Sequence, residues 1–493
     1  MTVSQPDAVL QGPAAPKRTL RPKSDKPSRW LWVPFIWLFF ASTRTLSTWM
    51  TWSGRGLATG TDVSGSPLDQ LLMTALMLLG LVVLGRRWER TRRILARNKW
   101  VVVLFVYMAL SIVWSNFPGL TLRRCARSSG TLLMVLVVLT EEKPLEAVRA
   151  LLRRLYLVFI PLSVFTIKYY RNIGVMYNWN GAEEEWTGLS VDKNSLGQVA
   201  MLSGLFWLWQ LFQDWTAKKP KRNVKKLALD ILLLAMSLWL LHGSKNVHSS
   251  TAILGFVTCT LVLIGLQFIK KEIARSKRVI LASAVAFMLL GPIVYLGFEL
   301  FDTSPAQMVL EATGRDMTLT DRTLIWTDVL NDAAKSPVLG VGMGAFWVGP
   351  MGYDMYPMPN WSRKTPQWRP EEGHDGYIDV YAELGVVGVA LLLMVIVNGF
   401  TGAFADLQSD FKFGSLRLVL LLSIIMNNVA ETSFLKGTHD LWFLFLLVSV
   451  NVPKPVRKAI SGRDSTVTDH SVNQHEQLLA NQILQLSPIP QHD

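Results

Sequence analysis

Long apolar blocks separated by short charged stretches are the feature that most constrains how this chain can fold. Most blocks hold about 16 to 21 residues, close to the roughly 20 that a helix needs to cross a bilayer. Half of the 493 residues are hydrophobic, and they gather in these blocks instead of alternating between core and surface as in soluble domains. The sequence predicts an all-α polytopic membrane protein with about twelve spans, at 30–50, 68–85, 99–115, 120–140, 152–168, 194–213, 227–243, 250–268, 279–298, 385–405, 415–431 and 440–452.

The distribution of positive charge predicts the orientation of the spans. With a cytoplasmic N-terminus and twelve spans, the segments on the cytoplasmic side hold 34 of the 50 Lys and Arg residues. Cytoplasmic loops are enriched in these residues, so runs such as 86–90 and 218–222 are topology signals. This explains the formal charge of +14 without a nucleic-acid partner, and both termini are expected in the cytoplasm.

The blocks also divide the chain into five parts. The first is polar and rich in Pro and Lys, which predicts a disordered leader, and the last is polar and Gln-rich, which predicts a disordered tail. We expect a cytoplasmic leader at 1–29, transmembrane helices 1–9 at 30–298, a periplasmic catalytic loop at 299–384, transmembrane helices 10–12 at 385–452 and a cytoplasmic tail at 453–493.

The connection at 299–384 is much longer than the other loops, and long loops in compact proteins are usually functional or disordered. Apolar residues at helical spacing predict a helix at 321–334, which Pro337 ends because proline cannot continue it. A glycine-rich turn is predicted next, at Gly340, Gly342 and Gly344. This loop is therefore expected to be partly helical and to carry the chemistry.

His374 and Asp375 lie where the loop meets a second helix that runs into the tenth predicted span. Histidine has an ordinary pKa near neutrality, so His374 is a candidate general base. Asp375 could orient the imidazole or take the base role itself. A solvated histidine without a catalytic role is the alternative at this point.

Arg322 opens the predicted loop helix, directly after Asp321, which has the side chain of a helix N-cap. A cation in the first turn gains nothing from the helix dipole. An arginine fork at a helix N-terminus suits a phosphate group. A salt bridge to a neighbouring carboxylate is the alternative.

Several cations fall toward the outer ends of predicted spans, where such residues usually face a cavity or snorkel to headgroups. Together they would suit a substrate with an anionic leaving group, such as a lipid-linked diphosphate. They are Arg44, Arg123, Arg124, Arg127, Lys193 and Lys245. Neither a metal-binding motif nor a phosphate-binding glycine loop with lysine is present, so no metal and no cofactor are predicted.

In combination these motifs resemble the O-antigen ligase and Wzy-type polymerase superfamily, most closely its ExoQ-like exopolysaccharide polymerases. His374, the nine residues 376–384, and the pair Gly385 and Gly388 match the spacing of the family's loop motif, although Asp375 replaces the usual Asn, Ser or Gln. Arg322 matches the arginine that opens the family's loop helix. Ser244-Lys245 and Lys193-Asn194 resemble motifs at the starts of two spans.

The resemblance implies a GT-C-like fold and metal-independent, inverting glycosyl transfer at the periplasmic face of the bacterial inner membrane. The donor would be an oligosaccharide on undecaprenyl diphosphate, and a chain-length regulator or export machinery would be further partners. Arg322 and Lys245, with Arg123, Arg124 or Arg127, would stabilise the leaving diphosphate, and His374 or the His374–Asp375 pair would activate the acceptor. Substrate binding would also involve Lys193, Asn194, Tyr377 and Trp347.

Three functions fit these residues. A polymerase joins repeat units into exopolysaccharide, whereas an O-antigen ligase moves the glycan to lipid A–core, and the two differ only in the acceptor. A transporter or flippase without catalysis is the third, but no internal repeat is visible in the sequence, which weakens it.

Overall fold

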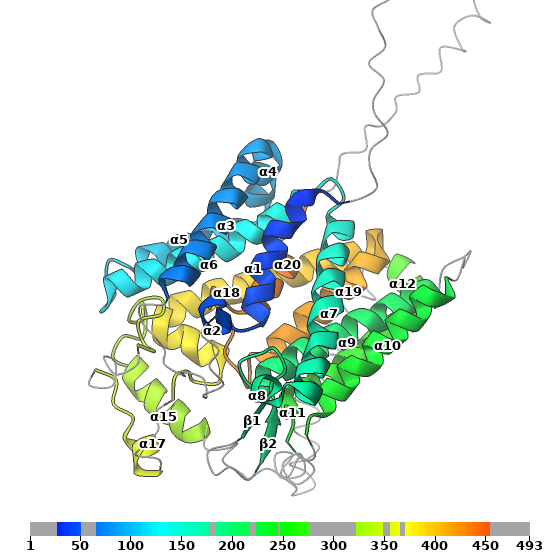
Figure 1. The fold of residues 1–493 in the computed structure, drawn as a ribbon. Helices are drawn as coiled ribbons and strands as arrows, with labels where there is room; N and C mark the ends of the chain where they lie inside the picture. Colours follow the sequence, from blue (N-terminus) through cyan, green and yellow to red (C-terminus); the bar gives the residue numbers. More distant parts are fainter. Residues whose placement is uncertain are drawn as a thin grey trace, which may run out of the picture. The chain divides into compact units, whose positions relative to one another are not determined.

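A computed structural model of the chain describes residues 27–50, 66–177, 183–215, 223–244, 247–275, 322–348, 355–364 and 370–453. Most of them lie in helices that pack into one bundle (Figure 1). This bundle belongs to a unit that ends at Val452. The predicted all-α fold class is therefore confirmed for the described residues, apart from one short hairpin.

The first half of the chain contributes the helices that come before a short β-hairpin. They are the 3-10 helix η1 (Arg29–Leu31), α1 (Trp32–Ser42), α2 (Leu46–Met50), α3 (Pro67–Arg86), α4 (Trp88–Arg97), α5 (Lys99–Leu110), α6 (Pro118–Leu139), α7 (Pro144–Tyr169) and α8 (Arg171–Gly174). The hairpin follows, with β1 (Val175–Tyr177) antiparallel to β2 (Glu184–Trp186) and Met176 opposite Glu185.

The second half begins with the buried helix α9 and ends with the helices that carry the loop. They are α9 (Lys193–Trp215), α10 (Val224–His242), α11 (Ser250–Phe268), α12 (Lys270–Arg275), α15 (Arg322–Ala333), α17 (Pro359–Lys364), α18 (Gly376–Ser409), α19 (Phe411–Asn427) and α20 (Asp440–Ser449). Helix α9 is mostly apolar and buried along most of its length, and it packs against α7, α10, α11 and α19.

Four described helices are long and apolar enough to cross a membrane: α3, α7, α11 and α18. Shorter apolar helices cover Arg29–Ser42, Lys99–Leu110 and Asp440–Ser449. The chain is thus a polytopic helical membrane protein, while the count of twelve spans remains a prediction. The predicted span 279–298 lies outside the described residues.

The first predicted span, 30–50, is not one continuous helix. Helix α1 ends at Ser42, and Thr43 is extended before α2 begins. The bend buries Arg44, which is 1% exposed and donates hydrogen bonds to the Ile173 carbonyl (2.9 Å) and the Thr187 hydroxyl (3.2 Å). Arg44 therefore anchors the segment around the hairpin, a contact that the apolar pattern does not encode.

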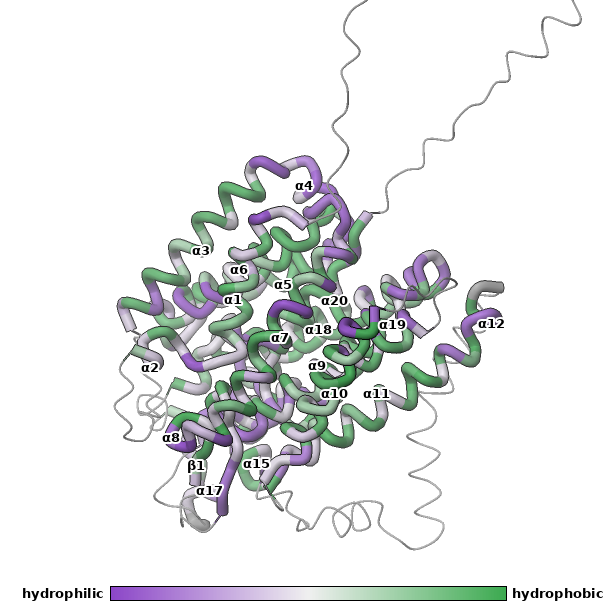
Figure 2. Tube along the Cα trace, turned by 45° about the vertical axis from the view of Figure 1, so that its right-hand side comes forward, coloured by the Kyte–Doolittle hydropathy of each residue, from purple (hydrophilic) through white to green (hydrophobic). Residues whose placement is uncertain are grey.

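The two ends of the bundle differ in what they carry. Helices α15 and α17 lie at one end together with α8 and the hairpin, while the arginine-rich α4 lies at the other end (Figure 1). Hydropathy follows this division, because α4 is mostly hydrophilic and α3 beside it is mostly hydrophobic (Figure 2). The loop segments and the hairpin therefore share one face of the bundle.

The predicted loop helix is confirmed as α15, and it helps to form a small core of its own. Ile325 and Val329 pack with Phe346 and Trp361 in this core, separately from the main one. Asp328 fixes α17 by accepting hydrogen bonds from the Asn360 side chain (2.6 Å) and the Trp361 amide (3.0 Å). The described part of the loop is thus a folded layer over the helices.

This layer docks into a break in α18. The helix is interrupted at Gly385, where φ is 64°. The backbone groups that the break frees form hydrogen bonds with the loop. The amide of Val386 donates to the carbonyl of Pro337 (2.9 Å), and the carbonyl of Glu383 accepts from the amide of Gly342 (2.9 Å). The predicted glycine turn is confirmed, with positive φ at each of its three glycines, Gly340, Gly342 and Gly344.

Candidate functional site

His374 lies in the short segment that enters α18, and its backbone has φ of 52°. A left-handed conformation is uncommon for a residue with a Cβ, and such strained residues cluster at functional sites. The next residue, Asp375, caps the helix by accepting hydrogen bonds from the amides of Tyr377 (2.8 Å) and Ile378 (2.9 Å). The turn between loop and helix therefore fixes where the imidazole lies.

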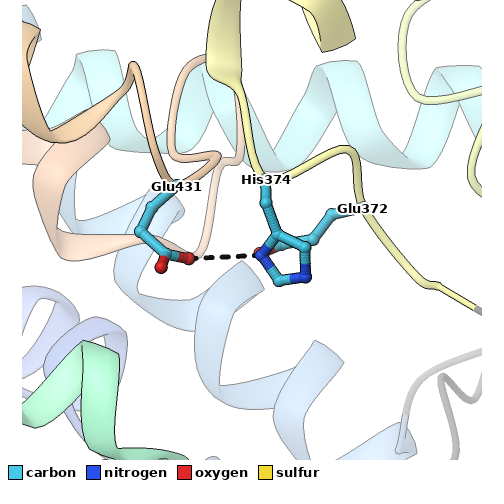
Figure 3. Close-up of side chains that lie close together, drawn as sticks. All are labelled: Glu372, His374 and Glu431. Carbon is cyan, nitrogen blue, oxygen red and sulfur yellow. Dashed lines mark hydrogen bonds and ion pairs between the residues drawn. The ribbon is translucent and has the colours of Figure 1, made fainter. Parts of the chain in front are cut away.

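The imidazole faces two carboxylates, Glu372 and Glu431 (Figure 3). His374 Nδ1 is 3.2 Å from Glu372 Oε1 and 3.3 Å from Glu431 Oε2. Ionised carboxylates only accept hydrogen bonds, so Nδ1 carries a proton in this arrangement. Among the described residues none is hydrogen-bonded to Nε2, which faces away from both carboxylates in Figure 3.

Asp375 therefore does not occupy the place that sequence reasoning offered it as the partner of the imidazole. Its carboxylate satisfies the first amides of α18, as an N-cap does. Within the described chain, Glu372 and Glu431 make the contacts with His374.

The two carboxylates also change how His374 titrates. Burial alone lowers the pKa of His374, but hydrogen bonds and charge interactions with Glu372 and Glu431 outweigh it and raise the pKa to about 9. Burial opposes ionisation of Glu372 as well, yet Lys436 and His374 hold the pKa of this carboxyl below its usual range. The imidazole is thus mostly protonated at pH 7, and the form with a free Nε2 lone pair becomes common only at higher pH.

Arg322 reaches the same site from the first residue of α15. One terminal nitrogen donates to the carbonyl of Ala430, and the other lies 2.8 Å from Glu431 Oε1. The salt bridge that sequence reasoning kept as an alternative is therefore present. Glu431 Oε1 also accepts a hydrogen bond from the side-chain amide of Asn194 (2.9 Å). Glu431 joins three predicted site residues that lie far apart in the sequence.

Lys436 is a cation of this site that sequence reasoning missed. Its ammonium group forms an ion pair with Glu372, the second carboxylate on the imidazole. Burial lowers the pKa of Lys436, but Glu372 and Asp379 outweigh this effect and raise it. The site is thus a row of alternating charges, from Lys436 through Glu372, His374 and Glu431 to Arg322.

Glu431 and Lys436 were missed because the apolar pattern placed the first at the end of a predicted span and the second in a short outer turn. A glutamate at the outer end of an apolar block is expensive unless it has a partner. The position of Glu431 at the end of an apolar block therefore indicated that this glutamate has a partner.

The three arginines of α6 do not point to one place. Arg124 binds the loop, with hydrogen bonds to the carbonyls of Gly344 and Trp347 (3.0 Å for the second). Arg123 is exposed and donates to Gly119 within its own helix. The charge of Arg127 interacts with Asp69 on α3 and with Arg123. Of the three, Arg124 therefore supports the loop, because its guanidinium holds the glycine turn.

Three predicted site residues remain: Lys193, Asn194 and Lys245. Lys193 forms a 2.6 Å ion pair with Glu185 of the hairpin. Asn194, its neighbour, reaches Glu431. Lys245 lies outside the described residues. Of the two described residues, Asn194 contacts the charge row, whereas Lys193 pairs with the hairpin.

The predicted aromatic residues support the loop. Trp347 donates from its indole nitrogen to Asp379 (2.9 Å), which also accepts the amide of Gly373 next to His374. Tyr377 donates to the carbonyl of Ile425 (3.3 Å) from the first turn of α18. Both side chains therefore hold the segment that carries His374.

Glu372, His374 and Glu431 also have the composition of a metal site, with candidate ligand atoms all within 4.8 Å of one another. However, Lys436 and Arg322 already compensate the two carboxylates. A divalent ion would be placed between two resident cations, and this repulsion disfavours it. The donor set fits an ion-pair network better than a metal.

Comparison with known proteins finds two matches, and both are connected with bacterial polysaccharides. Residues 232–393 match the family described as O-antigen ligase. Over 326 residues the chain is 23% identical to the exopolysaccharide production protein ExoQ of Rhizobium meliloti (strain 1021). That match covers 63% of this chain and 66% of ExoQ, slightly less than two thirds of the relative. The resemblance indicated by the motifs is confirmed, and it supports a role in polysaccharide polymerisation or ligation at a membrane.

Proposed function

Because the chain is related to O-antigen ligases and to ExoQ, we propose that it polymerises oligosaccharide repeat units into exopolysaccharide. The donor is a glycan on undecaprenyl diphosphate, and the transfer is metal-independent and inverts the anomeric carbon. The acceptor is a hydroxyl group of a second lipid-linked glycan. The observation that carries the proposal is the convergence of Arg322 and His374 on Glu431.

The proposed topology has twelve spans in the inner membrane, with both termini in the cytoplasm. The loop at 299–384 then faces the periplasm. The position of α4 supports this orientation, because its arginines lie at the opposite end from α15 and α17. The leader 1–29 and the tail 453–493 complete the proposed organisation.

In the proposed reaction His374 acts as the general base through Nε2. The acceptor hydroxyl gives its proton to Nε2 while its oxygen attacks C1 of the donor sugar. The bond between C1 and the diphosphate oxygen breaks, and the electron pair leaves with the lipid diphosphate. The imidazolium that results is stabilised by the carboxylates already on Nδ1, Glu372 and Glu431.

Cations near the leaving group stabilise the charge that develops on it. Arg322 has guanidinium N–H groups beyond those bonded to Ala430 and Glu431, and these are its proposed diphosphate donors. Lys436 is a second proposed cation, since it lies on the other side of His374 in the charge row. Arg123, Arg127, Lys193 and Lys245 remain proposed substrate contacts from the sequence, whereas Arg124 is proposed to act through the loop.

Polymer synthesis by the purified protein tests this function. The protein in detergent or liposomes is mixed with lipid-linked repeat units in the presence of EDTA, and products are separated by size. We expect polymer from the unmodified protein, and at most about 1% of that rate from His374→Ala or Arg322→Ala. Absence of polymer from well-folded protein, or near-normal polymer from both variants, would contradict the proposal.

Ligation to lipid A–core is the second candidate, favoured by the family match over 232–393. A deletion strain separates the two functions. Loss of polymerase leaves single lipid-linked repeats, whereas loss of ligase leaves long lipid-linked chains that fail to reach lipopolysaccharide. A transporter would instead leave repeat units on the cytoplasmic leaflet.

A further inference from the structure

We propose that Glu431 is the positioning residue that holds the proposed base and the proposed diphosphate-binding arginine in one fixed arrangement. This inference rests on the proposed function and adds to it a residue outside 232–393, the part that matches the ligase family. Glu431 lies in the turn between α19 and α20 and is 7% exposed.

Both carboxylate oxygens of Glu431 make polar contacts, and the two oxygens have different partners. Oε1 accepts hydrogen bonds from Arg322 (2.8 Å) and from the side-chain amide of Asn194 (2.9 Å). Oε2 lies 3.3 Å from Nδ1 of His374. Three segments therefore meet on one carboxylate: the start of α9, the start of α15 and the residue two positions before α18.

The turn that carries Glu431 is itself fixed to α18. The carbonyl of Asn428 accepts the amide of Gly376, the first residue of α18, at 2.8 Å. The side-chain oxygen of Asn428 accepts the amides of Ser433 (3.0 Å) and Phe434 (3.2 Å). The position of Glu431 relative to His374 is thus set by contacts that do not involve Arg322, as a rigid support for a site requires.

This placement has consequences for both partners. A carboxylate on Nδ1 fixes the tautomer whose Nε2 accepts a proton, and it stabilises the imidazolium that forms. The same carboxylate holds the guanidinium of Arg322 in one orientation, so its remaining donors need no reorganisation when charge develops on the diphosphate. Glu372 supplies only the first effect, because its cationic partner is Lys436.

The variant Glu431→Gln tests the proposal in the polymer assay. In glutamine one of the two oxygens becomes an NH2 group, so the side chain cannot offer one acceptor to Arg322 and another to His374 on the opposite side. We expect kcat to fall about 10- to 100-fold, in the range known for groups that orient a functional residue. We expect the KM for the lipid-linked donor to stay within about threefold, because Arg322 keeps its charge. The acidic limb of the pH profile should move to lower pH, since His374 loses one carboxylate.

Glu371→Gln is the matched control, because Glu371 is exposed in the loop that carries His374 and is not one of the two carboxylates on the imidazole. It should leave kcat and the pH profile unchanged. Glu431→Asp keeps the charge and should recover part of kcat with the unmodified pH profile. If Glu431→Gln does not purify as monodisperse protein, the kcat of Glu431→Asp tests the positioning role instead. A kcat about tenfold lower with KM unchanged supports the proposal, and a kcat within about twofold of the unmodified value overturns it.

The assay separates failure of this inference from failure of the proposed function. If the unmodified protein makes no polymer, the function is wrong. If it makes polymer while folded Glu431→Gln keeps its kcat and its pH profile, the function stands and the positioning role is wrong. A purely structural role would lower the thermal melting temperature and the amount of active protein without moving the pH profile.

Discussion

Gly385 lies against the backbone of Val338 so closely that a Cβ on the glycine would meet the Val338 carbonyl oxygen at 2.2 Å. The break in α18 and the docked loop segment thus need the same small residue. Gly340 has the reciprocal constraint, since a Cβ there would meet the carbonyl oxygen of Glu383 at 2.4 Å. The loop that carries the proposed chemistry is held to the membrane helix by backbone contact and not by side chains alone.

We expect Gly385→Ala to destabilise the docked loop by more than about 1 kcal/mol, because φ of 64° and the carbonyl of Val338 both oppose a Cβ. Limited proteolysis of the purified protein measures this as faster cleavage within 322–375. Gly85→Ala is the matched control, since a Cβ there meets nothing within 4 Å. Equal cleavage rates for the two variants would contradict the assigned contact.

The pKa of His374 predicts how polymerisation depends on pH. The proposed base needs Nε2 unprotonated, and the pKa is raised to about 9. The rate should therefore rise with pH from neutrality, reach half of its maximum near pH 9 and level off only above that pH. The initial rate of polymer formation between pH 6 and 10 measures it. A rate that is already constant from pH 7 upward would contradict the assignment.

The raised pKa of His374 also affects the stability of the fold. Stability is favoured by low pH, whereas the reaction rate is favoured by high pH. The folded pKa lies above the ordinary value of 6.5, so ionised His374 stabilises the fold fully below about pH 6.5. This contribution is lost as pH rises through about 9. The difference in melting temperature between the unmodified protein and His374→Ala should therefore shrink from pH 6 to pH 10. A difference that does not change with pH would mean that the imidazolium contributes nothing.

Arg322→Lys separates an enzyme from a transporter. The guanidinium contacts Ala430 and Glu431 through two different nitrogens, and a lysine ammonium cannot reproduce that fork. We expect at least about a tenfold loss of polymerisation rate although the charge is kept. Lys335→Arg, at an exposed residue of the same loop, is the comparison and should behave as the unmodified protein. Nearly normal polymer from Arg322→Lys would favour a non-catalytic role.

Arg124 should prove to be a loop anchor. Its removal leaves the carbonyls of Gly344 and Trp347 without their donor, which typically costs about 1 to 3 kcal/mol for each buried group. Arg124→Ala should therefore lower the melting temperature, whereas Arg123→Ala should not, because Arg123 is exposed. Similar melting temperatures for the two variants would contradict the assigned anchor.

The orientation of the loop can be checked by labelling Ser362→Cys on α17 with an impermeant maleimide in spheroplasts. Both native cysteines, Cys125 and Cys259, are buried, so the background should be low. We expect labelling at position 362, and none for Ser409→Cys at the predicted cytoplasmic end of α18 until the membrane is permeabilised. The reverse pattern would invert the proposed topology.

The sequence predicted the helices of the bundle well because apolar blocks of span length have few other folds available. It also predicted α15, the glycine turn and the place of His374, all of which have local signals. It did not predict the bend at Thr43, since the contacts of Arg44 with Ile173 and Thr187 are distant in sequence. The count of spans and the roles of the site residues stay predictions.

The sequence pattern did not predict which carboxylates contact His374. Asp375 was the natural candidate because it is adjacent, but adjacent side chains at a helix start are used for capping. The carboxylate of Glu431 comes from 57 residues further along the chain. No periodicity or motif spacing encodes that contact, because it depends on how α18, α19 and α20 pack together.

The site draws on residues from Asn194 to Glu431, and this spacing has a consequence for biosynthesis. A nascent chain that has inserted its helices through α18 already contains Arg322 and His374 but still lacks Glu431 and Lys436. The imidazole then has only one of its carboxylates, and Arg322 has no counter-ion from Glu431. The charge row is completed only when the turn between α19 and α20, which carries Glu431 and Lys436, leaves the ribosome. On the proposed mechanism, a partly translated copy in the membrane therefore lacks the carboxylate that orients its base and its arginine, and it is much less active until its insertion is finished.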